Sequence, residues 1–248
     1  MASTSETGHA KNAASLDQLI SVISAYGTIY NPSKSGLKLT ALQTLSSLAK
    51  TALSNVNTAE SAESNAIAAR KIAFSSIDKL VTRVQNAVIA TDTTTQVDET
   101  VKSIVRKIKG ERASAKLSEA DKATLVAEGK TSKQISSAQT SFDSRIENFD
   151  KLIKLLTSIT LYTPNENELK LTTLTTIYND LKAKNAAVMN ASTALSNARI
   201  VRNDIFYKAN TGLVDIALDA KTYIKSIFGA SSPQYKQATA IKFKTIKI

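Results

Sequence analysis

The sequence contains the same local pattern twice, and this internal duplication limits the fold more than any other feature. The segment Leu37-Lys-Leu-Thr recurs as Leu169-Lys-Leu-Thr, and a proline precedes it in both places, at Pro32 and Pro164. Self-similarity at a near-constant spacing is typical of repeated structural units. Further matches in the same order pair Asp17 with Asp150, Lys50 with Lys182, Val56 with Val188, Arg70 with Arg202 and Phe74 with Phe206. We therefore expect two tandem copies of one unit.

Each copy is expected to be helical. Only 7 Gly and 3 Pro occur in 248 residues, and both residue types interrupt helix interiors. We predict an all-α protein of two tandem, duplicated three- or four-helix units, each with a long central helix, in an elongated helical bundle. The expected helices cover 15–30, 37–90 and 98–108 in the first copy and 142–161, 168–210 and 213–228 in the second.

The long helix of the first copy leaves two interpretations open at Asn55-Val-Asn-Thr. A break there would give two helices of a compact four-helix bundle. The second copy has Ala187-Val-Met-Asn at the matching place, with no helix breaker, so we favour one continuous helix.

The duplicated elements and the composition between them indicate the domain boundaries. Gly110 and Gly229 stand where a glycine ends a helix, and Ser118 is a candidate N-cap of a short helix between the copies. The predicted division is a disordered N-terminal segment (1–13), helical repeat 1 (14–110), a linker with a short helix (111–141), helical repeat 2 (142–230) and a basic C-terminal tail (231–248).

A stripe of alanines recurs along the long helix of the first copy in a pattern close to a heptad. Such spacing favours a coiled-coil-like contact between helices. We expect this stripe to be a self-association seam. Its residues are Ala52, Ala59, Ala62, Ala66, Ala69 and Ala73.

Basic residues gather near the end of each copy, and the formal net charge of the chain is +11. A basic protein of this kind can attract nucleic acid or an anionic membrane surface, although solubility alone also accounts for such a charge. Lys102 and Arg106 of the first copy match Lys221 and Lys225 of the second, which suggests a duplicated polyanion-binding face. The candidate residues are Lys102, Arg106, Lys107 and Lys109 in the first cluster and Lys221, Lys225, Lys236, Lys242 and Lys244 in the second.

The residues needed for common catalytic and metal centres are scarce. The chain has no Cys, and its one histidine, His9, stands in a polar N-terminal segment where we expect it to be incidental. Without a second histidine or a thiolate, neither a usual transition-metal cluster nor a Ser-His or Cys-His pair is expected in the folded region. The glycines are isolated and form no phosphate-binding loop. We therefore expect no enzymatic activity, no cofactor and no small-molecule substrate.

The C-terminal stretch Tyr223-Ile-Lys-Ser-Ile-Phe-Gly-Ala-Ser-Ser-Pro-Gln-Tyr-Lys, followed by Ile241-Lys-Phe, resembles the end of a group of uncharacterised helical proteins of Bacteroidota-type bacteria. Those proteins carry a Phe-Gly-x-x-Ser-Pro-x-Tyr segment and a basic, apolar tail. The resemblance covers only this end of the chain and implies no function.

Three function classes follow from these features. The first is a non-enzymatic structural or interaction protein, a helical scaffold that self-associates or binds a protein partner. The second is a sequence-independent nucleic-acid-binding protein that uses the paired basic segments. The third is a membrane-active long-helix protein, but no apolar hairpin suited to insertion is evident, and we do not expect a membrane partner. With no secretory signal at the N-terminus and no transmembrane segment, we expect a cytoplasmic location.

Overall fold

The computed structural model describes residues 4–112, 118–129 and 140–245, and within these ranges it contains helices and no strand. This confirms the all-α class. The described chain forms two compact units, the first made of Met1–Ser64 with Asn190–Ile248 and the second of Asn65–Met189. Each unit has its own hydrophobic core.

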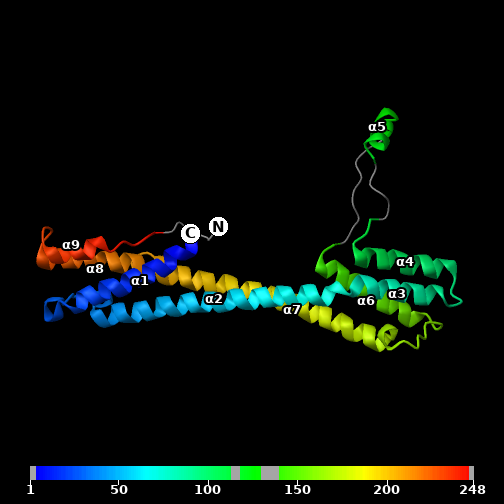
Figure 1. Cartoon of the computed structure of the whole chain (residues 1–248), viewed down its shortest axis with the longest axis horizontal. Coiled ribbons are helices and arrows are strands. Elements are labelled where there is room, and N and C mark those ends of the chain that lie inside the picture. The colour runs from blue at the N-terminus through cyan, green and yellow to red at the C-terminus, as the bar shows by residue number, and fades with distance from the viewer. Residues whose placement is uncertain (1–3, 113–117, 130–139, 246–248) are drawn as a thin grey trace. The chain divides into compact units, whose positions relative to one another are not determined.

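Unit 1 packs helices from both ends of the chain against one another (Figure 1). Helix α1 contacts α8 and α9. The apolar positions of α1 recur at helical spacing, and Leu16, Leu19 and Ile23 are buried to 1% exposure or less. Burying each of these side chains contributes roughly 1.5–3 kcal/mol to folding. The elements of the unit are α1 (Thr4–Ser24), η1 (Gly27–Ile29), η2 (Ser35–Leu37), the first part of α2 (Leu39–Ser75), the last part of α7 (Leu171–Tyr207), α8 (Leu213–Phe228) and α9 (Pro233–Ala240).

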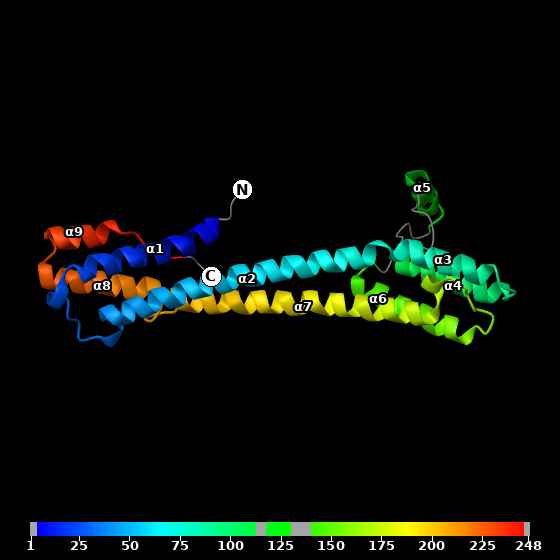
Figure 2. The same cartoon turned by 60° about the horizontal axis from the view of Figure 1, so that its bottom comes forward.

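Unit 2 has an equivalent core in the middle of the chain, where α6 packs against α4, and α4 against α3 (Figure 2). Its fully buried side chains include Phe149 of α6, Val84 of α3 and Ile108 of α4. The remaining elements are the end of α2, α3 (Ile77–Ile89), α4 (Thr95–Lys109), α5 (Glu119–Ala127), α6 (Phe142–Ser158), η3 (Asn167–Leu169) and the first part of α7.

The two units share local details at the matching sequence positions. Helices α2 and α7 are each 37 residues long and begin within the repeated tetrapeptide. In unit 1 the Tyr30 hydroxyl donates a hydrogen bond to the Leu37 carbonyl at 2.9 Å. In unit 2 the Tyr162 hydroxyl donates to the Leu169 carbonyl at 2.8 Å. Both bonds are buried and fix the turn that leads into the long helix.

The compact units differ from the expected repeat ranges 14–110 and 142–230. Unit 1 combines the start of the first copy with the end of the second, and unit 2 combines the end of the first copy with the start of the second. The physical reason is the choice of partner: α1 buries its apolar face on α8 rather than on α3 and α4 of its own copy.

The long helix of the first copy is continuous through Asn55, as favoured, but it does not reach residue 90. Helix α2 ends at Ser75, and α3 begins at Ile77. The Ser75 hydroxyl donates to the Ile72 carbonyl at 2.7 Å and competes there with the backbone ladder. The break allows both Phe74 and the stripe of α3 that starts at Ile77 to enter the unit 2 core.

The expected disorder of residues 1–13 is wrong for the described part of this segment, because α1 already begins at Thr4. His9 is 3% exposed. Its ring packs edge-on against Phe206 at 5.3 Å and Tyr207 at 5.4 Å between ring centroids. The histidine therefore belongs to the unit 1 core, and the polar residues around it concealed this in the sequence.

The end of the chain is also more ordered than a basic tail. Residues 233–240 form α9, and Ile241 is 4% exposed. Asn12 of α1 donates to the Lys244 carbonyl and accepts from the Lys244 amide, both at 2.8 Å. Ser15 donates to the Lys242 carbonyl at 2.9 Å. These bonds pin the extended stretch after α9 onto α1.

The short helix expected between the copies is confirmed as α5. Ser118 is its N-cap and forms a capping box with Asp121. The stretches 113–117 and 130–139 of the predicted linker lie outside the described residues.

Tyr162→Phe and Tyr30→Phe should each destabilise the protein by about 1–2 kcal/mol, because a buried carbonyl loses its donor. The measurement is urea unfolding followed by circular dichroism. Tyr178→Phe is the matched control, since no hydrogen bond joins the Tyr178 hydroxyl to another described residue, and it should change the unfolding free energy little. Equal losses in all three variants would contradict the assigned bonds.

His9→Phe should retain wild-type stability or exceed it, because Phe142 occupies the corresponding place in α6 and packs edge-on against Phe74 at 4.7 Å. His9→Ala should lose about 2–4 kcal/mol, since it removes a ring from a packed core. Thermal melting of the three proteins checks this. If His9→Ala melted like wild type, His9 would not be a core residue.

Candidate interaction surface

Within residues 4–112, 118–129 and 140–245, no group of three or more His, Asp or Glu side chains is placed to hold a metal ion. A hollow of about 620 Å³ in unit 1 is lined by residues of η2, α2, the loop after α7 and α8. Among the described residues that line it, Lys34 is the charged one.

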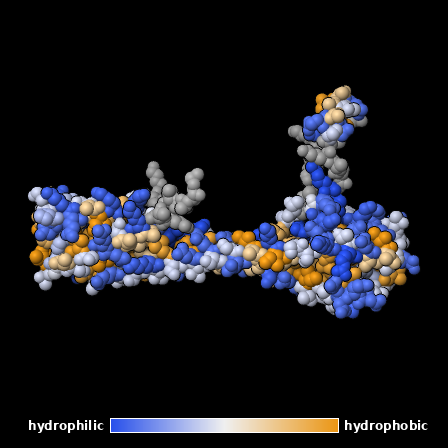
Figure 3. All heavy atoms as spheres, viewed as in Figure 1, coloured by the Kyte–Doolittle hydropathy of each residue, from blue (hydrophilic) through white to orange (hydrophobic). Residues whose placement is uncertain are grey.

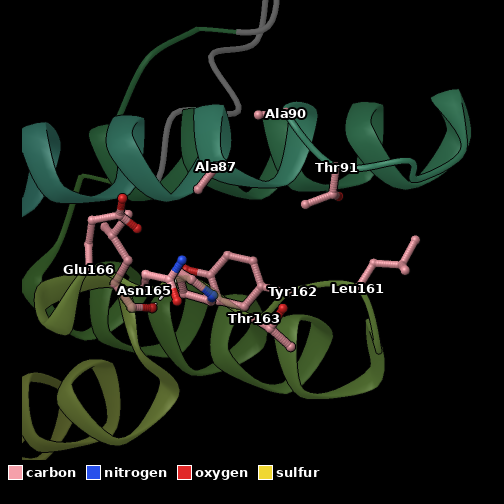
Figure 4. Close-up of a pocket in the computed structure, with 10 residues that line it drawn as sticks. Ala87, Ala90, Thr91, Leu161, Tyr162, Thr163, Asn165 and Glu166 are labelled. Carbon is pink, nitrogen blue, oxygen red and sulfur yellow. Dashed lines mark hydrogen bonds between the residues drawn. The ribbon is translucent and has the colours of Figure 1, made fainter.

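A pocket of about 300 Å³ in unit 2 is lined by the end of α3 and the loop that leads into η3 (Figure 4). Tyr162 and Glu166 are the titratable side chains among its lining residues. Burial, and then the nearby Glu166 charge, raise the pKa of Tyr162 to about 12. The Tyr162 hydroxyl therefore stays protonated at neutral pH, and it donates a hydrogen bond to the Leu169 carbonyl.

Asp17 and Asp150, which stand at matching sequence positions, are both partly exposed but take different partners in the two units. Asp17 accepts a hydrogen bond from buried Ser46 and pairs with Lys50 at 2.8 Å. Asp150 instead pairs with Lys154 one turn along its own helix, at 2.5 Å. Burial acts to raise the pKa of Asp17. The hydrogen bonds from Lys50 and Ser46, together with the Lys50 charge, outweigh burial and hold that pKa below its usual 3.8.

The expected alanine seam is partly occupied within the chain. Ala52 is 3% exposed and lies in the unit 1 core. Ala59, Ala66, Ala69 and Ala73 are half-buried, and of the six only Ala62 is exposed. Glu60, Glu63 and Arg70, which follow Ala59, Ala62 and Ala69 in the sequence, each bond to a residue of α7.

Polar bonds join α2 and α7 along this contact. In unit 1, Arg199 pairs with Glu60 at 2.8 Å, and Ser192 donates to Glu63. In unit 2, Arg70 donates to Asn185 at 2.9 Å. In unit 1, Glu60 of α2 pairs with Arg199 of α7, and the later residue Glu63 bonds to the earlier residue Ser192. The two helices therefore run antiparallel there.

Sequence reasoning missed a different set of residues on the same helices, large apolar side chains that face solvent. Figure 3 shows hydrophobic residues among the hydrophilic surface. The long-helix members, with exposed fractions, are Ile67 (44%), Ile72 (72%) and Met189 (55%) in unit 2 and Leu48 (50%), Ile200 (57%) and Val201 (53%) in unit 1. We call these six residues the exposed apolar set. Ile67 and Ile72 lie between the predicted alanine positions, so the heptad-like spacing of the alanines does not include them.

The two basic clusters differ in burial and in ion pairing. In unit 2, Lys102 pairs with Glu99 at 3.3 Å and Lys109 with Glu111 at 2.7 Å. Arg106 donates to the Glu111 carbonyl at 3.1 Å, and Lys107 is half-buried. In unit 1, Lys221 is 8% exposed. The other members of that cluster, Lys225, Lys236, Lys242 and Lys244, are exposed.

Comparison with known proteins finds no family model that matches the chain, no similar curated protein and no similar solved structure. Among the helices of the described residues, none is long and apolar enough to cross a membrane.

Because the Asp17 carboxyl has a lower pKa in the folded state than in the unfolded state, it adds stability above about pH 4. That contribution is lost as the pH falls from about 4 through the lowered pKa of the folded protein. Asp17→Asn should flatten this acid-side loss, whereas Asp180→Asn, at an exposed carboxylate of α7, should leave it intact. The loss of unfolding free energy at acid pH is measured by urea unfolding between pH 7 and pH 3. Identical pH profiles for wild type and Asp17→Asn would contradict the role of the Asp17–Lys50 pair.

Proposed function

We propose that the protein is a non-enzymatic helical scaffold that associates with a second copy of itself through the exposed apolar set on α2 and α7. The observation that carries this proposal is the exposure of large aliphatic side chains on otherwise well-ordered helices. Side chains such as Ile72 gain free energy when another surface covers them, at roughly 25 cal/mol per Å² of apolar area removed from water.

The two long helices carry charges of both signs. The whole chain has a net charge of +11, which opposes association between two molecules. Across α2 and α7 there are seven basic and four acidic residues, a net charge of +3. The residues are Lys50, Arg70, Lys71, Glu60 and Glu63 on α2 and Lys182, Lys184, Arg199, Arg202, Asp180 and Asp204 on α7. Two molecules that meet along these helices therefore repel each other moderately, and the apolar contact has to outweigh that repulsion.

The proposal includes the origin of the fold in a tandem duplication. Support comes from the matched tyrosine-to-carbonyl bonds and the equal lengths of α2 and α7. It also comes from the corresponding places of His9 and Phe142 beside a buried phenylalanine. On this proposal, the long helices of two protein molecules make an antiparallel contact of the same type as the contact between α2 and α7 within one molecule.

The two other function classes have less support. A nucleic-acid-binding face on both sequence repeats would need basic side chains that are exposed and unpaired in both clusters. Lys221 is instead buried, and Lys102 is paired with an acid. Membrane insertion would need a long apolar helix, and the described residues contain none that could cross a bilayer.

The test is the absolute mass of nuclease-treated protein by size-exclusion chromatography with light scattering over a wide concentration range. Wild type should shift toward a dimer or larger assembly as the concentration rises. Ile72→Glu and Val201→Glu should lower the association constant by about tenfold or more, because each places a charge in an apolar contact. Thr58→Glu, at an exposed polar position of α2, is the matched control and should associate like wild type.

A wild-type mass that stays monomeric at all concentrations would overturn self-association. Association that is equally strong in Ile72→Glu, Val201→Glu and wild type would overturn the assignment to the exposed apolar set.

A further inference from the structure

Lys221 is buried without a carboxylate partner, which is unusual for a lysine. Its side chain lies on α8 and is covered by the chain after α9. The Lys221 ammonium donates to the Ile241 carbonyl and lies over the Phe243 ring at 4.7 Å from its centroid. Within the described residues it takes part in no ion pair, and the sequence contains no Asp or Glu after Asp219. Among the described residues, its positive charge is compensated by the Ile241 carbonyl dipole and the face of the Phe243 ring.

A second lysine adds to this charge. Lys242 is exposed, and its ammonium donates to the Thr239 carbonyl at 3.0 Å. Burial, followed by the Lys242 charge, lowers the pKa of Lys221. Both effects disfavour the charged form of Lys221. An anion close to the two ammonium groups would favour the charged form and so act against both effects.

The two lysines line one hollow of about 320 Å³ on unit 1. Its walls also include Thr222 of α8, Tyr235 and Thr239 of α9, and Phe243. Among the described residues no carboxylate lines this hollow. Each ammonium uses one N–H group on a backbone carbonyl and has others left over. The hollow thus offers charged donors beside two aromatic rings and is open to solvent.

The corresponding position in unit 2 lacks these features. Lys102 of α4 matches Lys221 in the sequence, but it is exposed and pairs with Glu99 at 3.3 Å. In unit 1, by contrast, α9 and the stretch after it cover α8. The burial of Lys221 is therefore a property of this end of the chain and not a general consequence of the repeated helices.

We propose that the hollow between α8, α9 and residues 241–243 binds the phosphate group of a small soluble phosphate monoester, held by Lys221 and Lys242. Charge-assisted N–H donors in a partly buried site suit a phosphate oxyanion. Phe243 and Tyr235 line the same hollow and offer apolar surface to the organic part of such a ligand. This site is independent of the exposed apolar set on the long helices.

The test is an amide NMR titration of the full chain with inorganic phosphate and with phenyl phosphate, at constant ionic strength. Saturable shifts are expected at Thr222, Thr239, Lys242 and Phe243, with phenyl phosphate binding more tightly because it adds contact with the rings. Lys242→Gln, at an exposed position, should fold normally and weaken binding by about tenfold, as expected for the loss of one charge-assisted hydrogen bond. Lys102→Gln is the matched control and should bind like wild type.

Lys221→Met should abolish the saturable shifts, and its fold is checked by circular dichroism. If that variant does not fold, Lys242→Gln decides the matter alone. The proposal is overturned if wild type shows no saturable shift at these amides, or if Lys242→Gln binds as tightly as wild type. Binding to vesicles that contain phosphatidic acid, together with no binding of either soluble phosphate, would also contradict it.

Discussion

The fold depends on one packing choice: α1, at the start of the chain, buries its apolar face against the last helices, and α6 buries its own face against α4. In unit 1, Leu16, Leu19 and Ile23 of α1 join Ala217 and Ile224 of α8 in a single core. In unit 2, α6 packs on α4, and α4 packs on α3. An amphipathic helix cannot bury its stripe alone, so each unit needs contributions from both halves of the sequence.

The sequence predicts many elements because local signals decide them. Pro32 and Pro164 lie in loops as expected, and α8 begins and ends at the predicted residues, with Gly229 after it at φ 86°. Local signals do not decide which helix packs against which. The apolar faces of α1 and α6 are alike in character, so periodicity identifies the face that is buried without identifying what covers it. For this reason, the repeat ranges in the sequence do not predict which helices form each compact unit.

The candidate site residues show the same limit. Lys102 and Lys221 occupy matching places in the sequence, yet one is exposed beside Glu99 and the other is buried under residues that follow α9. Side-chain type does not reveal such burial, because it depends on a segment about twenty residues further on that folds back. The same holds for His9, whose neighbours in the sequence are polar while its neighbours in space are Phe206 and Tyr207.

The division of the chain into a continuous unit and a discontinuous one has a consequence for biosynthesis. Residues 65–189 leave the ribosome as one stretch and can complete unit 2 while the C-terminal helices are still being made. Helix α1 emerges first, and until α8 and α9 have been translated its partner within unit 1 is the first part of α2. The part of its Leu and Ile stripe that packs on α8 and α9 therefore stays uncovered longest in the nascent chain, and the association of α1 with these last helices completes unit 1.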